Sequence, residues 1–422
     1  MLDLKFIREN LDLVKQSLIN RNVRLDLDVL VNADEKRRKI LLEVEGLRAK
    51  QNVANDEISS LLKEKKDAKA KIASMKEISA RIDTLEDNLK LAQGQIDKVI
   101  LNIPNVTHSS IPVGKPDQNK IVRSWAEAPK FDFKPLTHIE LAQKLDIIDF
   151  NRATKITGSN FVLFKGWGAK LERALINFML DLHTTKHGYT EVLPPLLVNR
   201  ASMTGTGQLP KLEEDMYCLK DDDYFLIPTA EVPVTNIFRD EILKEEQLPI
   251  YYTAYTACFR KEAGTYGKDT KGLIRVHQFD KVEMVKFVKP EDSYNELESL
   301  VNNAEEVIQL LGIPYRVVML ATGDISFAAS KCYDLEAYSI GVDKWLEVSS
   351  CSNFEAFQAR RANIKFRRSD NKKTEFVHTL NGSGIALARI VVAILENYQQ
   401  KDGSIMIPEV LRPYLGGQKS IQ

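Results

Sequence analysis

The sequence predicts an α+β fold, in which an antiparallel β-sheet flanked by helices follows an N-terminal antiparallel two-helix coiled-coil arm. Three observations predict it. In the first 100 residues, apolar side chains follow a heptad repeat in two separate stretches. From about residue 121, short runs rich in β-branched and aromatic residues alternate with helical stretches. Many of these runs follow one another through loops instead of crossover helices, which favours an antiparallel sheet over a doubly wound parallel one.

The two heptad stretches define the arm. The first runs from Arg37 to Leu61 around a polar Gln51, and the second ends just before Pro104, which cannot continue a helix. Two matched helices joined by a short connection bury both seams only by folding back on each other, so we expect a hairpin. The apolar positions are Ile40, Val44, Leu47, Ala54, Ile58 and Leu61 in the first seam and Met75, Ile78, Ile82, Leu85, Leu89, Ala92, Ile96 and Val99 in the second.

The connection between the two helices is basic. Its ten residues from Leu62 carry five lysines against two acidic residues, and these lysines are Lys63, Lys65, Lys66, Lys69 and Lys71. The tip is either the solvated end of a spacing or dimerisation rod or a surface that reaches a phosphate backbone. An irregular stretch follows the arm. We therefore expect an N-terminal domain over residues 1–105 with the arm at about 30–100, a linker over 106–120 and a second domain over 121–422.

Composition limits the possible functions. With 44% hydrophobic and 28% charged residues, the 422-residue chain has the balance of a soluble globular protein. Its 59 basic and 59 acidic side chains cancel, so a nucleic-acid surface would have to be local. The amino terminus has no apolar signal run, and the longest apolar stretch, 385–395, is broken by Arg389 and is too short to cross a bilayer. We expect a cytoplasmic protein without a membrane segment.

The cysteines argue against a disulfide framework and against a zinc site. Cys218, Cys258, Cys332 and Cys351 stand singly, with no C-x-x-C pair and no histidine at metal-ligand spacing. The sequence also lacks the Gly-rich dinucleotide fingerprint and the Walker lysine. A nucleotide would have to be held in another way, and no zinc is expected.

The stretch from Thr256 to Phe287 is the richest in chemistry, and it predicts two strands around a loop rich in Gly and Lys. Along the returning strand, alternation separates a polar face from an apolar one. The polar face would carry Arg275, His277, Phe279, Lys281 and Glu283, and Arg260 and Glu262 share a face of the first strand. Guanidiniums suit phosphates, an aromatic ring suits a base and carboxylates suit an amino group. The alternative is a hairpin with a salt-bridged outer face.

A second constellation lies near the C-terminus. Asn381-Gly382-Ser383-Gly384 precedes an apolar run and is interpreted as the opening of a long helix, where glycines would let a ligand approach the backbone. Arg389 is the only charge from 385 to 395 and needs a partner, because an unpaired buried charge is costly. Water, a carboxylate or a ligand phosphate could satisfy it.

Two shorter groups combine hydroxyls with a carboxylate. Thr229-Ala230-Glu231 follows a predicted strand at 224–227, and Glu347-Val348-Ser349-Ser350 ends another. These residue types suit an amino-alcohol substrate or a hydrated Mg²⁺. They are also common as helix caps.

In order and spacing, these segments resemble the signature motifs of class II aminoacyl-tRNA synthetases, and in particular those of the seryl-tRNA synthetase family of bacterial type. Residues 187–195 resemble motif 1, which forms the dimer interface in this class. Residues 259–262 resemble motif 2, and Gly382-Ser383-Gly384 with Ala386 and Arg389 resembles motif 3. The resemblance spans almost the whole chain, including the arm, the TAE triplet at 229–231 and the EVSS stretch at 347–350.

The resemblance implies a serine–tRNA ligase that activates L-serine with ATP and transfers it to the 3′ end of tRNA(Ser), and of tRNA(Sec), as a homodimer. Arg260 and Arg389 would be catalytic. ATP would be bound by Arg260, Glu262, Arg275, Val276, Phe279, Glu347, Val348, Ser349, Ser350 and Arg389, with Mg²⁺ held by Glu347 and Ser350. Serine would be bound by Thr229, Ala230, Glu231, Arg260, Glu283, Asn381 and Ser383. The lysines of the arm, Lys63, Lys65, Lys66, Lys69 and Lys71, would contact tRNA.

Each rival function would lack a feature that this sequence contains, or would need one that it lacks. A truncated homologue that charges a carrier protein would lack the arm. A coiled-coil adaptor with an inactive synthetase-like domain would have lost Arg260, Glu262, Glu283 or Arg389, and all four are present. A sister synthetase would lack the TAE triplet together with Glu283 and Ser383. A divergent archaeal branch that holds serine through a Cys-rich zinc site does not match the isolated cysteines.

Overall fold

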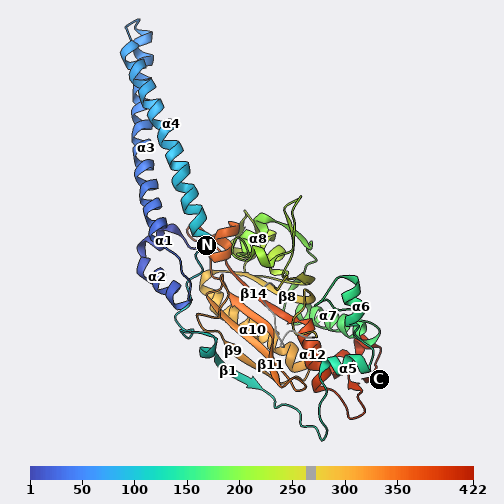
Figure 1. Ribbon diagram of the computed structural model, residues 1–422. Coiled ribbons are helices and arrows are strands. Elements are labelled where there is room, and N and C mark those ends of the chain that lie inside the picture. Colours follow the sequence, from blue (N-terminus) through green and yellow to red (C-terminus); the bar gives the residue numbers. More distant parts are fainter. Residues whose placement is uncertain (263–271) are drawn as a thin grey trace. The chain divides into compact units, whose positions relative to one another are not determined.

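The computed structural model describes residues 1–262 and 272–422, which divide into two compact units. One unit comprises Leu2–Pro104, and the other comprises Met1 with Asn105–Gln422. Figure 1 shows the helical unit in blue and the sheet-containing unit in teal to red. The predicted α+β class with a two-helix arm is confirmed.

The helical unit contains a long antiparallel helix pair. Its helices are α1 (Leu4–Glu9), α2 (Leu11–Asn20), α3 (Asp28–Lys63) and α4 (Lys69–Ile100). Ile40, Val44 and Leu85 form a buried cluster between α3 and α4. Gln51 lies further along the seam, and its side-chain amide donates to the hydroxyl of Ser79 on the other helix (3.1 Å). The heptads therefore face each other as predicted, and the polar position of one seam meets a polar partner.

The basic residues surround the turn between the two helices. Lys63 is the last residue of α3, and Lys69 is the first residue of α4. Lys65 and Lys66 lie in the turn and are exposed. Lys71 pairs with Glu57 of α3 and Lys66 pairs with Glu64, so acidic neighbours balance part of the positive charge around the turn.

The second unit is built on an eight-stranded sheet of order β1-β9-β10-β11-β14-β8-β7-β2. Neighbouring strands are antiparallel except β2 and β7 at one edge. The strands are β1 (Lys120–Trp125), β9 (Tyr315–Met319), β10 (Lys331–Ser339), β11 (Lys344–Asn353), β14 (His378–Ala386), β8 (Gln278–Val288), β7 (Ile250–Phe259) and β2 (Thr190–Glu191). The predicted antiparallel sheet is thus confirmed.

Three small sheets complete the strands of the described residues. They are β13 (Thr374–Phe376), β12 (Lys365–Arg367) and β6 (Ile242–Lys244); β3 (Leu197–Asn199), β5 (Tyr224–Leu226) and β4 (Cys218–Leu219); and β15 (Ile405–Met406) with β16 (Ser420–Ile421).

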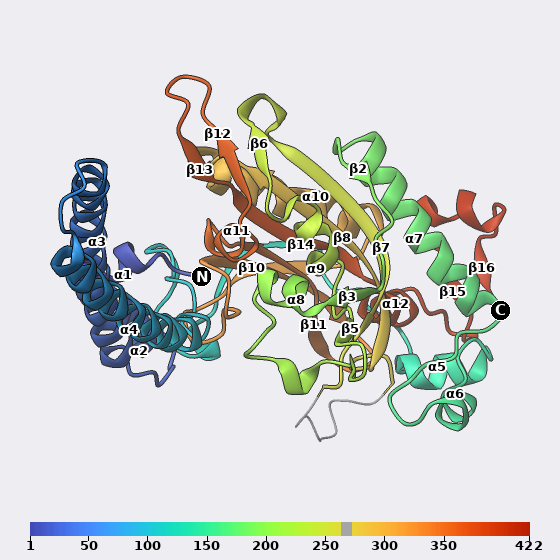
Figure 2. The same ribbon diagram turned by 90° about the horizontal axis from the view of Figure 1, so that it is seen from above.

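Helices flank the large sheet. They are α5 (His138–Lys144), α6 (Phe150–Ile156), α7 (Trp167–Thr185), α8 (Arg200–Thr206), α9 (Glu231–Thr235), α10 (Ser293–Leu310), α11 (Phe357–Ala362) and α12 (Leu387–Asn397). α10 packs on β14 and β11, and α7 packs on β7 and touches both α10 and α12. Figure 2 shows α7 beside β2 and β7. None of the helices within residues 1–262 and 272–422 is both long and apolar enough to cross a bilayer.

The prediction that residues 381–384 open a helix is wrong. They lie in β14, which pairs with β8 on one side and β11 on the other, and α12 begins only at Leu387. A central strand that is buried on both faces has no polar alternation. The apolar pattern of β14 could therefore not be separated in the sequence from that of the apolar helix that follows.

Candidate active site

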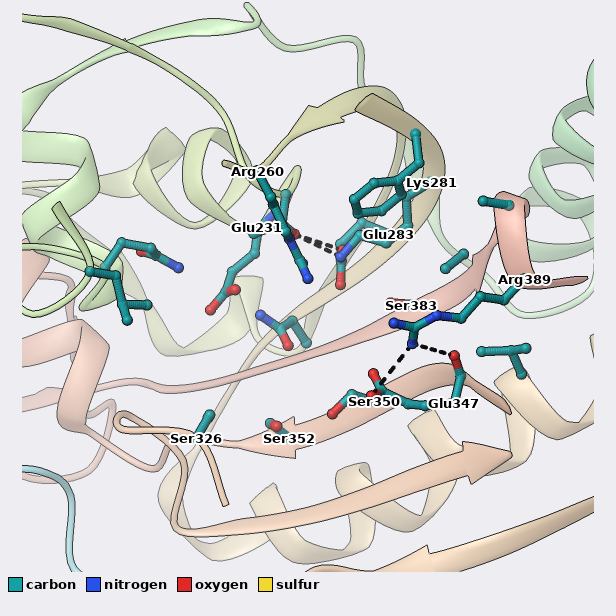
Figure 3. Close-up of a pocket in the computed structure, with 18 of the residues that line it drawn as sticks. Glu231, Arg260, Lys281, Glu283, Ser326, Glu347, Ser350, Ser352, Ser383 and Arg389 are labelled. Carbon is teal, nitrogen blue, oxygen red and sulfur yellow. Dashed lines mark hydrogen bonds and ion pairs between the residues drawn. The ribbon is translucent and has the colours of Figure 1, made fainter. Parts of the chain in front are cut away.

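A cavity of about 320 Å³ lies over β8, β11 and β14 (Figure 3). This volume is within the range of small-molecule sites. Most of the predicted site residues line it, and they are Thr229, Glu231, Arg260, Glu262, Arg275, Val276, Phe279, Glu283, Glu347, Val348, Ser350, Asn381, Ser383 and Arg389. Four stretches that lie far apart in the sequence therefore meet in one place.

Strand alternation on β8 builds one wall of the cavity. Phe279, Lys281 and Glu283 line it, while Val282 and Met284 are fully buried. The predicted place of His277 on the same face is wrong. β8 begins only after His277, whose ring Nδ1 lies 2.9 Å from the backbone oxygen of Arg260 and holds the two arms of the hairpin together.

Lys281, Glu283 and Thr229 form a buried cluster at one end of the cavity. The two charged side chains form an ion pair and are 8% and 2% exposed. The hydroxyl of Thr229 donates to Oε2 of Glu283 (2.8 Å) and accepts from Nζ of Lys281 (2.9 Å). A carboxylate held this way inside a cavity is a strong partner for a ligand ammonium, because little water competes for it.

Glu231 adds a second carboxylate, which is half-buried. Burial and the negative charge of Glu283 raise its pKa to about 7, against a hydrogen bond from Gln358 that lowers it. The amide nitrogen of Gln358 lies 2.6 Å from Oε1 of Glu231. Glu231 therefore changes charge near neutral pH.

Arg260 and Phe279 lie together in the cavity. The guanidinium carbon of Arg260 is 5.2 Å from the ring centre of Phe279, and its Nε donates to the backbone oxygen of Pro228 (3.2 Å). Nearby, Arg275 pairs with Glu262. An aromatic face with guanidiniums beside it suits a base joined to phosphates.

Arg389 extends into the cavity from the first turn of α12. Its Nη1 donates to the backbone oxygen of Glu347 (2.6 Å) and lies 3.6 Å from Oε2 of the same residue, as the dashed lines of Figure 3 show. Its Nε donates to the backbone oxygen of Ile274 (3.1 Å). The carboxylate partner considered from the sequence is thus present, and it is itself a cavity residue.

A β-bulge determines which residues of β11 reach the cavity. Leu335 of β10 pairs with Ser349 and Glu336 pairs with Glu347, so Val348 is an extra residue. Glu347 and Ser350 therefore both line the cavity although they are three positions apart. Ser349 points away, and its hydroxyl donates to the backbone oxygen of Ser383 (2.6 Å).

Two of the predicted residues do not line the cavity. Ser349 lies behind β11 because of the bulge, and Ala230 is fully buried in a core cluster that includes Val285 and Phe287. The sequence alone does not show whether the side chains of Ala230 and Ser349 face the cavity.

The glycines of β14 face the core and not the ligand side that we expected. A Cβ on Gly382 would come within 2.6 Å of the sulfur of Cys351, and one on Gly384 would come within 2.5 Å of Nε2 of His183. Gly384 is also the unpaired residue of a bulge between Ser383 and Ile385. Close packing against the neighbouring strand β11 explains Gly382, and close packing against α7 explains Gly384.

Some lining residues had no predicted role. Lys281 was expected on the polar face but was not assigned to a ligand. Others come from two stretches without a motif, and they include Gln208, Leu212, Ser326 and Phe327. Only the tertiary fold brings these stretches to the cavity.

Glu347 and Ser350 suit a magnesium ion that arrives with a nucleotide. A carboxylate and a hydroxyl lie on one wall of the cavity, and Mg²⁺ prefers such oxygen ligands together with phosphates and water. The described residues contain no group of three or more His, Cys, Asp or Glu side chains that could hold a metal ion on their own. A magnesium ion here would depend on the nucleotide for its remaining ligands.

Comparisons with known proteins decide the family. A model described as the seryl-tRNA synthetase N-terminal domain matches residues 1–107, and one described as the tRNA synthetase class II core domain (G, H, P, S and T) matches residues 216–398. The serine–tRNA ligase of Trichlorobacter lovleyi is 59% identical over 422 residues, which are 100% of each chain. The chain belongs to the seryl-tRNA synthetase family.

Other members of the seryl-tRNA synthetase family are similar over their whole length. The serine–tRNA ligase of Thermodesulfovibrio yellowstonii is 56% identical over 420 residues, 99% of each chain. The solved structure of seryl-tRNA synthetase from Pyrococcus horikoshii, complexed with ATP, has a TM-score of 0.94 and 40% identity, and the match covers 100% of this chain and 99% of that one. The resemblance drawn from the motifs is confirmed.

Proposed function

We propose that this member of the seryl-tRNA synthetase family is a serine–tRNA ligase. It activates L-serine with ATP to seryl-adenylate, with release of diphosphate, and transfers serine to the 3′ end of tRNA(Ser). One observation carries the proposal. A single cavity contains a buried carboxylate cluster suited to an amino acid and, beside it, an aromatic ring with guanidiniums suited to a nucleotide. The full-length similarity to serine–tRNA ligases supports it.

In this proposal the nucleotide lies between Phe279 and Arg389. Phe279 stacks on adenine, and Glu262 accepts from the adenine amine. Arg260 binds the α-phosphate, and Arg275 and Arg389 bind the terminal phosphates. Val276, Val348 and Ser350 line the same cavity and complete the nucleotide site, with Ser349 next to them in β11. The solved structure of seryl-tRNA synthetase from Pyrococcus horikoshii is complexed with ATP, which supports ATP as the nucleotide.

Serine lies at the other end of the cavity. Its ammonium is bound by Glu231, Glu283 and Thr229, and its hydroxyl is bound by Ser383, with Asn381 close by. The backbone at Ala230 lies between Thr229 and Glu231. Alanine would leave the buried polar groups of this corner unpaired, so the corner favours serine by about 10⁴-fold or more.

The chemistry needs positioning rather than a protein nucleophile. The serine carboxylate attacks the α-phosphorus in line, and Arg260 neutralises the charge that develops on the phosphoryl oxygens. Mg²⁺ bound through Glu347 and Ser350 would supply further neutralisation on the phosphates when it is present. In the second step the terminal ribose hydroxyl of tRNA attacks the carbonyl of the adenylate.

Exchange of diphosphate into ATP tests this function. The full chain with ATP and Mg²⁺ is assayed with each of the twenty amino acids, and serine alone should support exchange. Arg260→Ala should abolish it, whereas Lys261→Ala, next in sequence but absent from the cavity lining, should keep it. Exchange with another amino acid, or none with serine, would contradict the proposal.

The basic turn of the helix pair is the proposed tRNA surface. Lys63, Lys65, Lys66, Lys69 and Lys71 surround the turn and supply a local positive charge on a chain that is neutral as a whole. We propose that tRNA(Ser) binds there, and that tRNA(Sec) is charged as well. Charging of both tRNA transcripts with labelled serine tests this, with a tRNA for another amino acid as the control.

We also propose a cytoplasmic homodimer. The segment that resembles motif 1 includes β2 at the edge of the large sheet and Leu193, which is 85% exposed. An exposed apolar side chain at an open sheet edge is a suitable contact for a second copy. Sedimentation equilibrium should give twice the chain mass, and a fully active monomer would refute the dimer. The isolated cysteines suit a reducing compartment.

A further inference from the structure

Glu396, at the C-terminal end of α12, is a fully buried carboxylate surrounded by hydrogen-bond donors. Its Oε1 accepts from the backbone N–H and from the ring Nδ1 of His138, both at 2.8 Å. Its Oε2 accepts from the hydroxyl of Ser339 and from the backbone N–H groups of Gly341 (2.8 Å) and Val342 (3.1 Å). Burial alone would raise the pKa of Glu396, but the hydrogen bonds from His138 and Ser339 bring it below its usual value. Glu396 is therefore a rigid anion inside the core.

These contacts determine the tautomer of His138. Its Nε2 lies 3.3 Å from the backbone nitrogen of Leu273, which can only donate, so Nε2 has no proton. Nδ1 therefore carries the proton and donates it to Glu396. The ring is 1% exposed. Through two hydrogen bonds, His138 connects the end of α12 to Leu273.

Leu273 belongs to the segment 272–276, which forms part of the cavity wall. Leu273, Ile274, Arg275 and Val276 all line the cavity. The backbone of Gly272 has a φ of +72°, and a Cβ there would come within 2.2 Å of Nε2 of His138. Glycine is needed at this position both for the left-handed backbone and for the close approach to the ring.

The N-terminal end of α12 also contacts the segment 272–276. Arg389, in the first turn of α12, donates from Nε to the backbone oxygen of Ile274 (3.1 Å). Glu396, seven positions later, holds the neighbouring Leu273 through His138. One rigid helix therefore fixes two adjacent residues of the wall, directly before Arg275.

We infer that His138 is a positioning residue for the nucleotide half of the site. It fixes the segment 272–276 against α12. It thereby places Arg275, Val276 and the carbonyl of Ile274, which accepts from Arg389. The inference rests on the proposed function, since it assumes that these residues bind ATP. It concerns ATP and not serine, because Thr229, Glu231, Glu283 and Ser383 lie on other elements.

Two substitutions separate this role from simple support of the fold. In His138→Asn, the amide nitrogen lies near the position of Nδ1 and can still donate to Glu396, but the acceptor for Leu273 is lost. In His138→Gln, the amide oxygen lies near the position of Nε2 and can still accept from Leu273, but the donor to Glu396 is lost. A structural role predicts that Asn is the milder change for every property, because it keeps the buried anion paired.

A positioning role predicts the opposite order for the KM for ATP, with His138→Asn as the more harmful change. In serine-dependent diphosphate exchange, His138→Asn should raise the KM for ATP by about 10- to 100-fold, whereas His138→Gln should raise it by less than about threefold. The KM for serine should change by less than about twofold in both. The melting temperature should fall more in His138→Gln. Equal KM values for ATP in the two variants, or parallel rises for ATP and serine, would overturn the inference.

A spectroscopic measurement tests the contact without any activity. The chain has six histidines, so the ring ¹⁵N signals of the labelled protein are few, and that of His138 is the one missing in His138→Asn. We expect a protonated Nδ1 and an unprotonated Nε2. A protonated Nε2 would overturn the inference, since it could not accept from Leu273. Failure of the wild-type chain to exchange diphosphate with serine would instead contradict the proposed function and leave this result unaffected.

Discussion

Glu231 and Glu283 lie close enough inside the cavity that the charge of Glu283 helps to raise the pKa of Glu231 to about 7. Glu283 is paired with Lys281, whereas Glu231 is bonded to the neutral amide of Gln358. The two carboxylates therefore have different electrostatic surroundings before any ligand binds. Glu283 has a cationic counter-ion, and Glu231 gains a proton when the pH falls below about 7.

This difference predicts the pH dependence of serine binding. Below about pH 7, Glu231 is protonated in the empty site and no longer attracts the serine ammonium. We expect the KM for serine to rise by up to about tenfold per pH unit below that value, while the KM for ATP changes little. Exchange assays between about pH 5.5 and 8.5 measure it. Glu231→Gln should have a high KM for serine at every pH, and a wild-type profile as flat as that of the variant would contradict the prediction.

Glu283 is expected to be the stronger determinant of serine binding. Glu283→Gln removes the charge that faces the ammonium and leaves the buried Lys281 without its counter-ion. We predict a rise of about 100-fold or more in the KM for serine, with ATP binding to the free protein within about threefold of the wild type. Calorimetry with ATP and exchange kinetics with serine measure the two effects. Equal losses for both ligands would indicate a general collapse of the cavity.

Local sequence patterns predicted those parts of the site that depend on one strand or one motif. The alternation of side chains along a strand correctly placed Phe279 and Glu283 on the cavity face, because β8 is regular from Gln278 onward. It failed at Ser349, since one extra residue in β11 reverses which side chains face the cavity. A bulge leaves little trace in a single sequence.

Contacts between distant stretches could not be predicted. His138 contacts Leu273 and Glu396 across 135 and 258 positions, and its neighbourhood contains no motif. The predicted role of the β14 glycines was wrong for the same reason, because Gly382 meets Cys351 through the pairing with β11 and Gly384 meets His183 through the packing of α7. The heptads, by contrast, were predicted because both of their partners lie in one repeating pattern.

The basic turn of the helix pair should affect transfer to tRNA but not activation. Replacing Lys65 and Lys66 together by Glu reverses two exposed charges in the turn. We predict a fall of about tenfold or more in kcat/KM for tRNA(Ser) charging and a weaker dependence on salt. Serine-dependent exchange should be unchanged. The matched control is Lys39→Glu, which reverses an exposed charge near the start of α3, and an equal fall in that variant would contradict a specific role for the turn.

Glu172 is predicted to limit stability at neutral pH. It is 6% exposed on α7, and its Oε2 has no hydrogen-bond partner in the described part of the chain. Burial, and then the charge of Asp280, raise its pKa well above 4.5. The folded state therefore retains a proton that the unfolded state releases once the pH exceeds the ordinary value. Stability is highest below that value and falls by up to about 1.4 kcal/mol per pH unit above it.

Glu172→Gln should therefore stabilise the protein, since a neutral amide of the same shape has no charge to desolvate. We expect the melting temperature to rise by about 3 °C near pH 8 and to match the wild type near pH 4.5. Glu305→Gln is the matched control, because Glu305 is also 6% exposed but accepts from Arg123 and Tyr315. That variant loses an ion pair and should be destabilised at neutral pH. Calorimetric scans of both variants across this range decide the prediction, and a Glu172→Gln protein that melts below the wild type near pH 8 would show that the carboxylate is ionised and paired in the folded state.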